Sequence, residues 1–220
     1  VRAVQAPAAL ETVTDLLRAA EAVAQTDGEE AGLNFMKNYS VNGKPLDEFT
    51  YRMAACQLLS RLESDQALET WMKFAEDYRE FPLVLKEALA ATVVRSDEEA
   101  RTTLIQWMRD CYEEGIDWQL EEIALQLEQD ESEKVAAAAL VRLDELQPRA
   151  PSNPTAYGLM VVAYERIGQP AKAVAVLQKA IQVGAARPEY FLRAAQLLMS
   201  QEEEFLAVDL AQKLVAQSNV

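Results

Sequence analysis

Two consecutive stretches decide the fold: PTAYGLMVVAYERIGQPAKAVAVLQKAIQVGAAR at residues 154–187 and PEYFLRAAQLLMSQEEEFLAVDLAQKLVAQ at residues 188–217. The prolines that open them are 34 residues apart, and the same interval separates Ala173 from Ala207. A fixed period of this length is typical of stacked supersecondary units. The two stretches therefore predict a repeat architecture.

Each stretch has the pattern of two amphipathic helices joined by a short turn. In the 154–187 stretch, large apolar residues of the first helix recur at spacings of three and four: Tyr157, Met160, Val161 and Tyr164. Gly168 ends this helix, and Pro170 suits the start of the next one. The second helix carries its own apolar stripe: Ala173, Leu177, Ala180 and Ile181. Because neither helix can bury its stripe alone, each pair must stack on its neighbours.

This pattern resembles the tetratricopeptide repeat (TPR) family, which has a large aromatic, Leu-Gly and Tyr on the first helix, then Ala and an aromatic on the second. The matching positions are Tyr157, Met160 and Val161, Tyr164, Ala173 and Leu177. Val161 stands where the family often has glycine, and Leu177 where it often has an aromatic. The resemblance implies an all-α fold, a right-handed α-solenoid of about six antiparallel helix pairs in a TPR-like superhelix.

The small residue of the second helix allows the repeat to be followed back to the N-terminus. The candidates are Ala31, Ala67, Ala100, Ala139, Ala173 and Ala207, and the residues four positions later are Phe35, Trp71, Leu104, Leu143, Leu177 and Ala211. The interval of 39 residues between Ala100 and Ala139 predicts a longer connection at 113–117. We expect one solenoid domain over 1–220, with repeats at about 9–39, 46–78, 82–113, 118–147, 154–183 and 188–217.

Within these repeats, local signals predict where helices begin and end. The predicted pairs are 9–25 and 29–39, 46–61 and 64–78, 82–94 and 97–113, 118–129 and 132–147, 154–167 and 170–183, and 188–200 and 203–217. Capping side chains are expected at Ser64 and Asp65, Ser96 and Asp97, and Ser132. A loop is expected at 40–45, where Asn42 and Gly43 form a turn signal. The period runs through 147–153 without slipping, so we interpret that segment as a turn between repeats rather than a domain linker.

The charge of the chain argues against several partners. There are 21 basic and 36 acidic residues, and the formal net charge is −15. This charge repels a phosphate backbone, so no nucleic acid partner is expected. No apolar run is long enough to span a bilayer, so no direct membrane insertion is expected. The acidity attracts a basic partner, but it also serves solubility alone.

The sequence offers little for catalysis. It contains no histidine, which removes the commonest general base and the commonest zinc ligand. No nucleophile-elbow, Walker A, dinucleotide-binding or C-x-x-C motif is present. We therefore predict no catalytic residue, no metal site, no cofactor and no enzymatic activity. Cys56 and Cys111 lie in apolar helical stretches and are expected to be buried free thiols; a disulfide between them and the compartment of the protein stay open.

The TPR resemblance also implies where a partner would bind. In that family the first helix of each pair lines the concave face of the solenoid. The corresponding candidates here are Arg52, Cys56, Leu85, Leu89, Glu128, Val162, Leu192 and Gln196. Some family members use Lys and Asn at these places to clamp a carboxylate, whereas this strip offers Arg52 alone. A mostly apolar groove suits a helix or an extended peptide, and the alternative is that a neighbouring element or a second copy covers it.

The predicted function is that of a protein–protein interaction scaffold that binds a peptide or protein partner of unknown identity in the concave groove. An alternative is a regulatory or substrate-docking region of a larger enzyme or of a secretion or assembly system, because the chain begins with Val1 rather than methionine. Self-association through the apolar strip or an uncapped end is a further interpretation. We expect a soluble chain, and both a cytoplasmic and a periplasmic location stay open.

Overall fold

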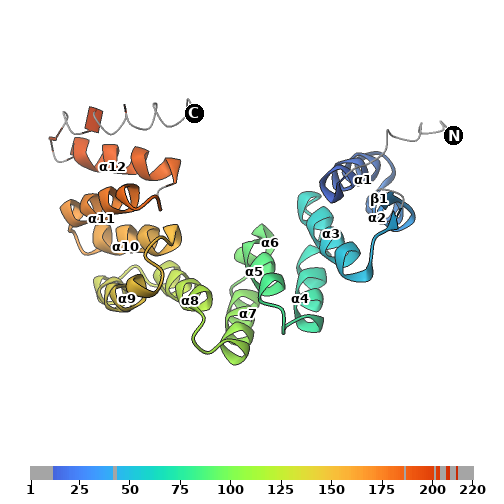
Figure 1. Cartoon of the computed structure of the whole chain (residues 1–220), viewed down its shortest axis with the longest axis horizontal. Helices are drawn as coiled ribbons and strands as arrows, with labels where there is room; N and C mark the ends of the chain where they lie inside the picture. Colours follow the sequence, from blue (N-terminus) through green and yellow to red (C-terminus); the bar gives the residue numbers. More distant parts are fainter. Residues whose placement is uncertain are drawn as a thin grey trace. The chain divides into compact units, whose positions relative to one another are not determined.

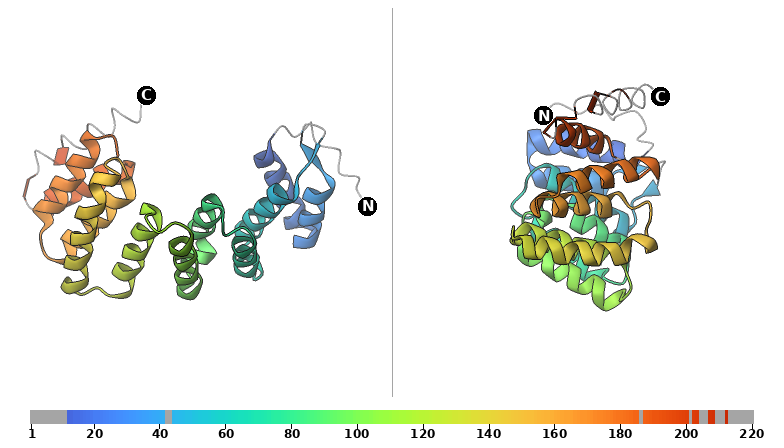
Figure 2. Two further views of the ribbon diagram at one scale, coloured as in Figure 1. Left: turned by 60° about the horizontal axis from the view of Figure 1, so that its bottom comes forward. Right: turned by 90° about the vertical axis from the view of Figure 1, so that its left-hand side faces the viewer.

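The computed structural model of the protein describes residues 12–41, 44–185, 187–200, 202, 203, 207, 208 and 212. The chain divides into two compact units, Val1–Glu113 and Glu114–Val220, which we call unit 1 and unit 2. The two units are built from helices, as Figures 1 and 2 show, and the all-α solenoid class is confirmed. None of the helices in the described part is both long and apolar enough to cross a membrane.

Unit 1 is formed by helical pairs and one short ladder. Its elements are α1 (Val13–Asp27), α2 (Glu29–Asn38), β1 (Ser40–Val41), β2 (Lys44–Pro45), α3 (Glu48–Arg61), α4 (Ala67–Asp77), α5 (Pro82–Ala90), α6 (Thr92–Arg95) and α7 (Glu98–Cys111). The strands pair antiparallel with Ser40 opposite Pro45. The loop expected at 40–45 therefore contains a two-residue ladder, and its turn residues Asn42 and Gly43 lie outside the described residues.

Unit 2 is a stack of longer helices. Its elements are α8 (Ile116–Gln129), α9 (Glu133–Leu146), the 3-10 turn η1 (Gln147–Arg149), α10 (Pro154–Arg166), α11 (Pro170–Gln182) and α12 (Pro188–Ser200). Figure 1 shows α10, α11 and α12 one above another in yellow to red. The predicted helix at 203–217 falls largely outside the described residues. The longer connection predicted at 113–117 coincides with the boundary between the units; continuity of the array across it stays a prediction.

The predicted helix pairs match the observed ones within a few residues, with one internal break. The helix predicted at 82–94 ends at Ala90, because Ala91 adopts an extended backbone with φ −65° and ψ 130°. A separate turn of helix, α6, follows at once. Thr92, Val93 and Val94 are all β-branched, and restricted side-chain rotation lowers their preference for a continuous helix.

The 34-residue period of the last two repeats is repeated in the backbone hydrogen bonds. The Gln169 amide donates to the Tyr164 carbonyl at 2.9 Å, and 34 residues later the Glu203 amide donates to the Leu198 carbonyl at 2.9 Å. Gly168 has φ 69° and Glu202 has φ 63°, so the same left-handed turn occurs in both repeats. This conformation costs a residue with a Cβ roughly 1–2 kcal/mol. The tertiary fold thus imposes the turn even where glycine is absent.

Most of the small residues predicted on the second helices are buried. Five of the six predicted alanines are buried: Ala67, Ala100, Ala139, Ala173 and Ala207. In unit 2, Ala173 packs in one core cluster with Tyr157, Leu177 and Phe191. A side chain of one carbon lets two helix backbones approach, so that the large residues around it interlock.

The first repeat differs from the prediction by one residue. Ala31 is only half-buried, whereas Gly32 is buried and a Cβ there would lie 2.7 Å from the Ala24 Cβ and 2.8 Å from the Ala20 carbonyl oxygen. Four positions later, Met36 is fully buried, while the predicted Phe35 is half-buried and stacks on Tyr39. Gly32 and Met36 therefore occupy the places assigned to Ala31 and Phe35.

Two of the predicted helix caps are confirmed and one is different. Asp97 accepts a hydrogen bond from the Ala100 amide at 2.8 Å, and Ser132 accepts one from the Val135 amide at 3.4 Å. Ser64 accepts a hydrogen bond from the Gln66 amide at 3.2 Å and donates one to Glu29 at 2.8 Å, but α4 begins three residues after it. The Ser64 hydroxyl thus links α2 to the turn before α4.

We predict that Ala173→Leu lowers the free energy of unfolding by about 1–3 kcal/mol, because the larger side chain overpacks a fully buried contact. Ala138→Leu on the exposed side of α9 is the matched control and should change it by less than about 0.5 kcal/mol. Thermal and urea unfolding measure both. Equal stability of the two variants would contradict the assigned register.

The revised register of the first repeat makes its own prediction. Gly32→Ala should destabilise the protein by about 1–2 kcal/mol, because overpacking against fixed backbone outweighs the gain of about 1 kcal/mol in helix propensity. Asn34→Ala, on the exposed side of the same helix, should cost nothing measurable. Urea unfolding distinguishes them, and a stabilised Gly32→Ala variant would restore the original register.

Candidate functional site

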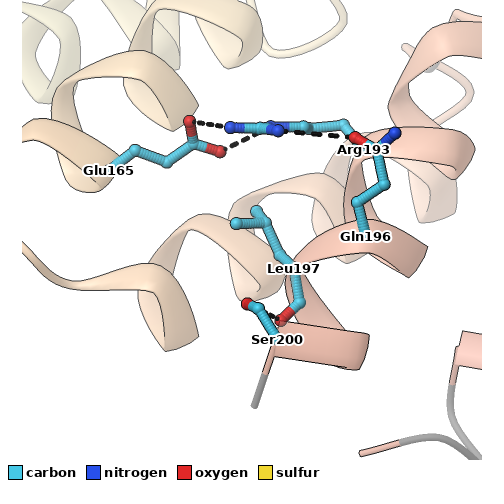
Figure 3. Close-up of polar contacts among 5 residues, drawn as sticks. All are labelled: Glu165, Arg193, Gln196, Leu197 and Ser200. Carbon is cyan, nitrogen blue, oxygen red and sulfur yellow. Dashed lines mark hydrogen bonds and ion pairs between the residues drawn. The ribbon is translucent and has the colours of Figure 1, made fainter. Parts of the chain in front are cut away.

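Polar contacts join the helices α8, α10 and α12 of unit 2, which correspond to predicted first helices. Arg193 of α12 binds Glu165 of α10 through Nε to Oε1 at 2.8 Å and Nη2 to Oε2 at 2.5 Å (Figure 3). Arg166 of α10 donates to the main-chain carbonyls of Leu127 and Asp130 at the end of α8. A cation at a helix C-terminus is stabilised by the helix dipole. These contacts hold the three helices side by side.

The Glu165–Arg193 pair fixes charge as well as position. Its bidentate geometry is the strongest form of a guanidinium–carboxylate contact, and the hydrogen bonds that Arg193 donates to Glu165 raise the pKa of Arg193. Arg193 also donates to Gln196 at 3.4 Å, which orients the amide on the same helix. Because the Arg193 side chain is about half exposed, we assign the pair at most ~1 kcal/mol of stability.

Four of the predicted partner-binding residues lie exposed on these helices: Glu128, Val162, Leu192 and Gln196. Leu192 and Gln196 are one helical turn apart on α12, and Val162 precedes Glu165 by one turn on α10. Met199, which follows Leu192 by two turns, is 52% exposed. We call Glu128, Val162, Leu192, Gln196 and Met199 the unit 2 strip. The i, i+7 spacing from Leu192 is the sequence signal that identifies Met199.

Tyr190, from the next repeat, lies against α10 at Gly158, one turn before Val162. A Cβ at Gly158 would lie 2.8 Å from the Tyr190 hydroxyl. That hydroxyl donates to the Pro154 carbonyl, and burial raises the pKa of Tyr190. The hydroxyl end of Tyr190 therefore fills the space that a side chain at Gly158 would need, and Val162, one turn further along α10, is exposed.

The other four predicted residues lie in unit 1, and three of them are buried. Cys56 and Leu85 are fully buried, and Leu89 is 4% exposed. A partner can contact only exposed atoms, so the prediction is corrected for these three: they pack in the core of unit 1. The TPR spacing indicates which face of a first helix a partner would contact. In this chain α5 ends at Ala90, and α6 and α7 pack against it.

Arg52 is the fourth residue in unit 1, and its charge is engaged within the protein. Its Nη2 lies 2.7 Å from the Asp77 carboxylate, and its guanidinium lies 5.3 Å from the ring centroids of Phe74 and Tyr78. The hydrogen bond with Asp77 counteracts desolvation and the pKa of Arg52 rises. The charge of Arg52 is thus compensated within unit 1 by Asp77.

The two cysteines occupy different environments. Both are free thiols; Cys56 is buried as expected, whereas Cys111 is exposed, which corrects the prediction for that residue. Cys111 is the last residue of α7, and its side chain is exposed there. The Cys56 sulfur lies 3.7 Å from the Thr70 carbonyl, and desolvation by burial raises its pKa to about 12. Cys56 is therefore a neutral thiol and a poor nucleophile at neutral pH.

In the described ranges, no three histidine, cysteine, aspartate or glutamate side chains come together as a group that could hold a metal ion. Asp130, the residue that follows α8, has a carboxylate that is hydrogen-bonded within the chain. It accepts a hydrogen bond from the Ser132 amide at 2.8 Å. That bond lowers the pKa of Asp130.

We predict that one thiol per chain reacts with Ellman's reagent in the folded protein and two react in denaturant. Burial raises the pKa of Cys56 above its ordinary value of 9.0. Its neutral thiol therefore stabilises the fold below pH 9, and this contribution is lost as the pH rises towards about 12. In a Cys111→Ser variant the folded protein should be unreactive at pH 8. Rapid reaction of that variant would contradict the assigned burial of Cys56.

Comparison with solved structures identifies the class of this fold. The chain is similar to "MamA 41-end from Desulfovibrio magneticus RS-1", with a TM-score of 0.54 and 19% identity over 79% of this chain and 97% of that one. It is similar to "MamA RS-1 ArsTM double mutant" with a TM-score of 0.53, again at 19% identity, over 79% and 96% of the two chains. These neighbours are TPR-like α-solenoids, and at this identity the likeness shows the fold alone.

The sequence comparisons add no closer assignment. No protein-family model matches the chain, and the search of curated proteins finds no match. The TPR-like architecture therefore rests on the helix pairs, on their 34-residue period in the last two repeats, and on the similarity to these solenoids.

Proposed function

We propose that this chain is a non-catalytic protein–protein interaction scaffold that binds a peptide or protein partner on the unit 2 strip. The observation that carries the proposal is the exposure of three apolar side chains on α10 and α12: Val162 at 38%, Leu192 at 57% and Met199 at 52%. They lie on neighbouring helices that the Glu165–Arg193 pair joins.

The composition of the strip suits a partner with hydrophobic anchors. Exposed apolar residues provide contact area, and Gln196 and Glu128 add hydrogen-bonding groups at its margins. An amphipathic helix or an extended peptide presents such anchors at regular intervals. Arg193 is already paired with Glu165, which favours apolar recognition over capture of a terminal carboxylate.

The helices that carry the strip are held in place before any partner binds. Arg166 joins α10 to α8 and Arg193 joins α12 to α10. A surface that needs no rearrangement loses less conformational entropy on binding. Rigid positioning of contact residues, rather than proton transfer or nucleophilic attack, is what this arrangement supports.

A photo-crosslinking experiment in the native host tests the proposal. The chain carries p-benzoylphenylalanine at Leu192, or at Val141 as the matched control, since Val141 is 62% exposed on the second-helix side. We expect a protein adduct from position 192 and none of the same mass from position 141. A Val162→Glu change should reduce the adduct at least about tenfold, because an unpaired carboxylate buried at a contact costs more than ~1.4 kcal/mol.

Mass spectrometry of the adduct identifies what occupies the strip. A heterologous protein or peptide supports the scaffold function, and a second copy of this chain would replace it with self-association. Identical adducts from both positions, or adducts that survive Val162→Glu unchanged, would contradict a specific surface at the unit 2 strip.

A further inference from the structure

Unit 1 contains an aromatic cluster that extends from the core to the surface. The Phe49 ring lies 5.5 Å from Phe74, 5.1 Å from Tyr78 and 6.3 Å from Phe81, measured between centroids. Tyr78 and Phe81 are 6.1 Å apart in an edge-to-face arrangement. Such spacings are those of favourably packed aromatic pairs. The rings come from α3, from α4 and its C-terminal cap, and from the turn before α5.

Exposure rises steadily across the cluster. Phe74 is fully buried, Phe49 and Tyr78 are half-buried, and Phe81 is 54% exposed. Leu83, two residues after Phe81, is 59% exposed. We call Phe49, Tyr78, Phe81 and Leu83 the aromatic edge. Two large exposed apolar side chains so close together leave unpartnered surface in unit 1.

The inner side of the same cluster already holds a guanidinium. Arg52 lies over the rings of Phe74 and Tyr78 and is neutralised by Asp77 at 2.7 Å. Aromatic faces attract cations through the ring quadrupole, and arginine is the commonest partner. The cluster therefore shows, within one molecule, the combination of ring face and carboxylate that binds an arginine side chain.

The surroundings of the aromatic edge are acidic. The segments 47–52 and 76–81 carry five acidic residues and two basic ones. The acidic residues are Asp47, Glu48, Glu76, Asp77 and Glu80, and the basic ones are Arg52 and Arg79. Arg52 is neutralised by Asp77. An approaching anion is repelled, and a cation gains from both the rings and the carboxylates.

The turn that presents Phe81 is fixed in place. The Phe81 amide donates to the Tyr78 carbonyl at 2.9 Å, and the Tyr112 hydroxyl of the segment after α7 donates to the Glu80 carbonyl. These two bonds hold the residues between α4 and α5 from both sides. The aromatic edge is therefore a preorganised surface.

From this geometry we infer that the aromatic edge is a second docking surface, which takes an arginine-bearing segment of a protein partner. The arginine stacks on Phe81 and Tyr78 with its charge facing the neighbouring carboxylates, and an apolar residue beside it contacts Leu83. This inference deepens the proposed scaffold function and rests on it, but it concerns a different unit and a different chemistry of recognition.

The test uses the full chain labelled with nitrogen-15 and the peptide acetyl-Gly-Leu-Arg-Gly-Leu-Arg-Gly-amide as the probe. We expect the amide resonances of residues 78–81 and of Leu83 to shift during the titration. The matched peptide with both arginines replaced by citrulline, which keeps the shape and removes the charge, should bind about threefold to tenfold more weakly. Equal affinity for the two peptides would overturn the recognition of a cation.

Protein variants locate the site. Phe81→Ala should weaken binding of the arginine peptide by about threefold to tenfold, and Phe81→Leu, which keeps apolar area without a ring face, should weaken it nearly as much. Val141→Ala, at an equally exposed position on α9, should leave it unchanged. Circular dichroism melts check that all variants fold. Unchanged binding by Phe81→Ala, or shifts confined to residues that do not contact the aromatic edge, would overturn the assignment.

A further variant separates this inference from the proposed function. Val162→Glu together with Leu192→Glu disables the unit 2 strip and should leave the arginine peptide bound with wild-type affinity. If the peptide binds and the crosslinking at Leu192 fails, the aromatic edge stands without the strip; the reverse result leaves the strip and removes the aromatic edge.

Discussion

The close contact between two helix backbones within each pair is the constraint on which the rest of the structure depends. It requires a residue with little or no side chain at one place on the second helix, met by Ala173 in one repeat and by Gly32 in the first. Once the backbones approach, large residues such as Leu177 fill the space around the contact. The angle of each pair, and hence the direction of its exposed residues, follows from this packing.

Polar contacts then fix successive pairs to one another within a unit. In unit 2 these contacts use main-chain carbonyls at helix ends, reached by Arg166 and by the Tyr190 hydroxyl. The carbonyls of the last turn of a helix lack an intrahelical partner, so Arg166 satisfies those at the end of α8 without disturbing that helix. Tyr190 instead binds the Pro154 carbonyl in the first turn of α10. The surface that carries the candidate site is therefore rigid because the ends of its helices are bound.

Much of the fold could be predicted from the sequence, because helix periodicity and the 34-residue interval are local signals. The break at Ala91 and the choice of Gly32 over Ala31 could not, since both depend on atoms brought close by the tertiary fold. The exposure of the candidate partner-binding residues could be predicted only in part. Exposure is confirmed for Val162 and Leu192, but Leu85 and Leu89 are covered by the elements that follow α5, which helix spacing alone does not reveal.

The contact between Gly158 and Tyr190 ties two repeats together in a way that limits their evolution. Gly158 belongs to one repeat. Tyr190, whose hydroxyl occupies the space that a side chain at Gly158 would need, belongs to the next. A repeat copied or exchanged alone would bring a clash or leave a hole, so the two positions have to change together. These two repeats are consequently not interchangeable modules.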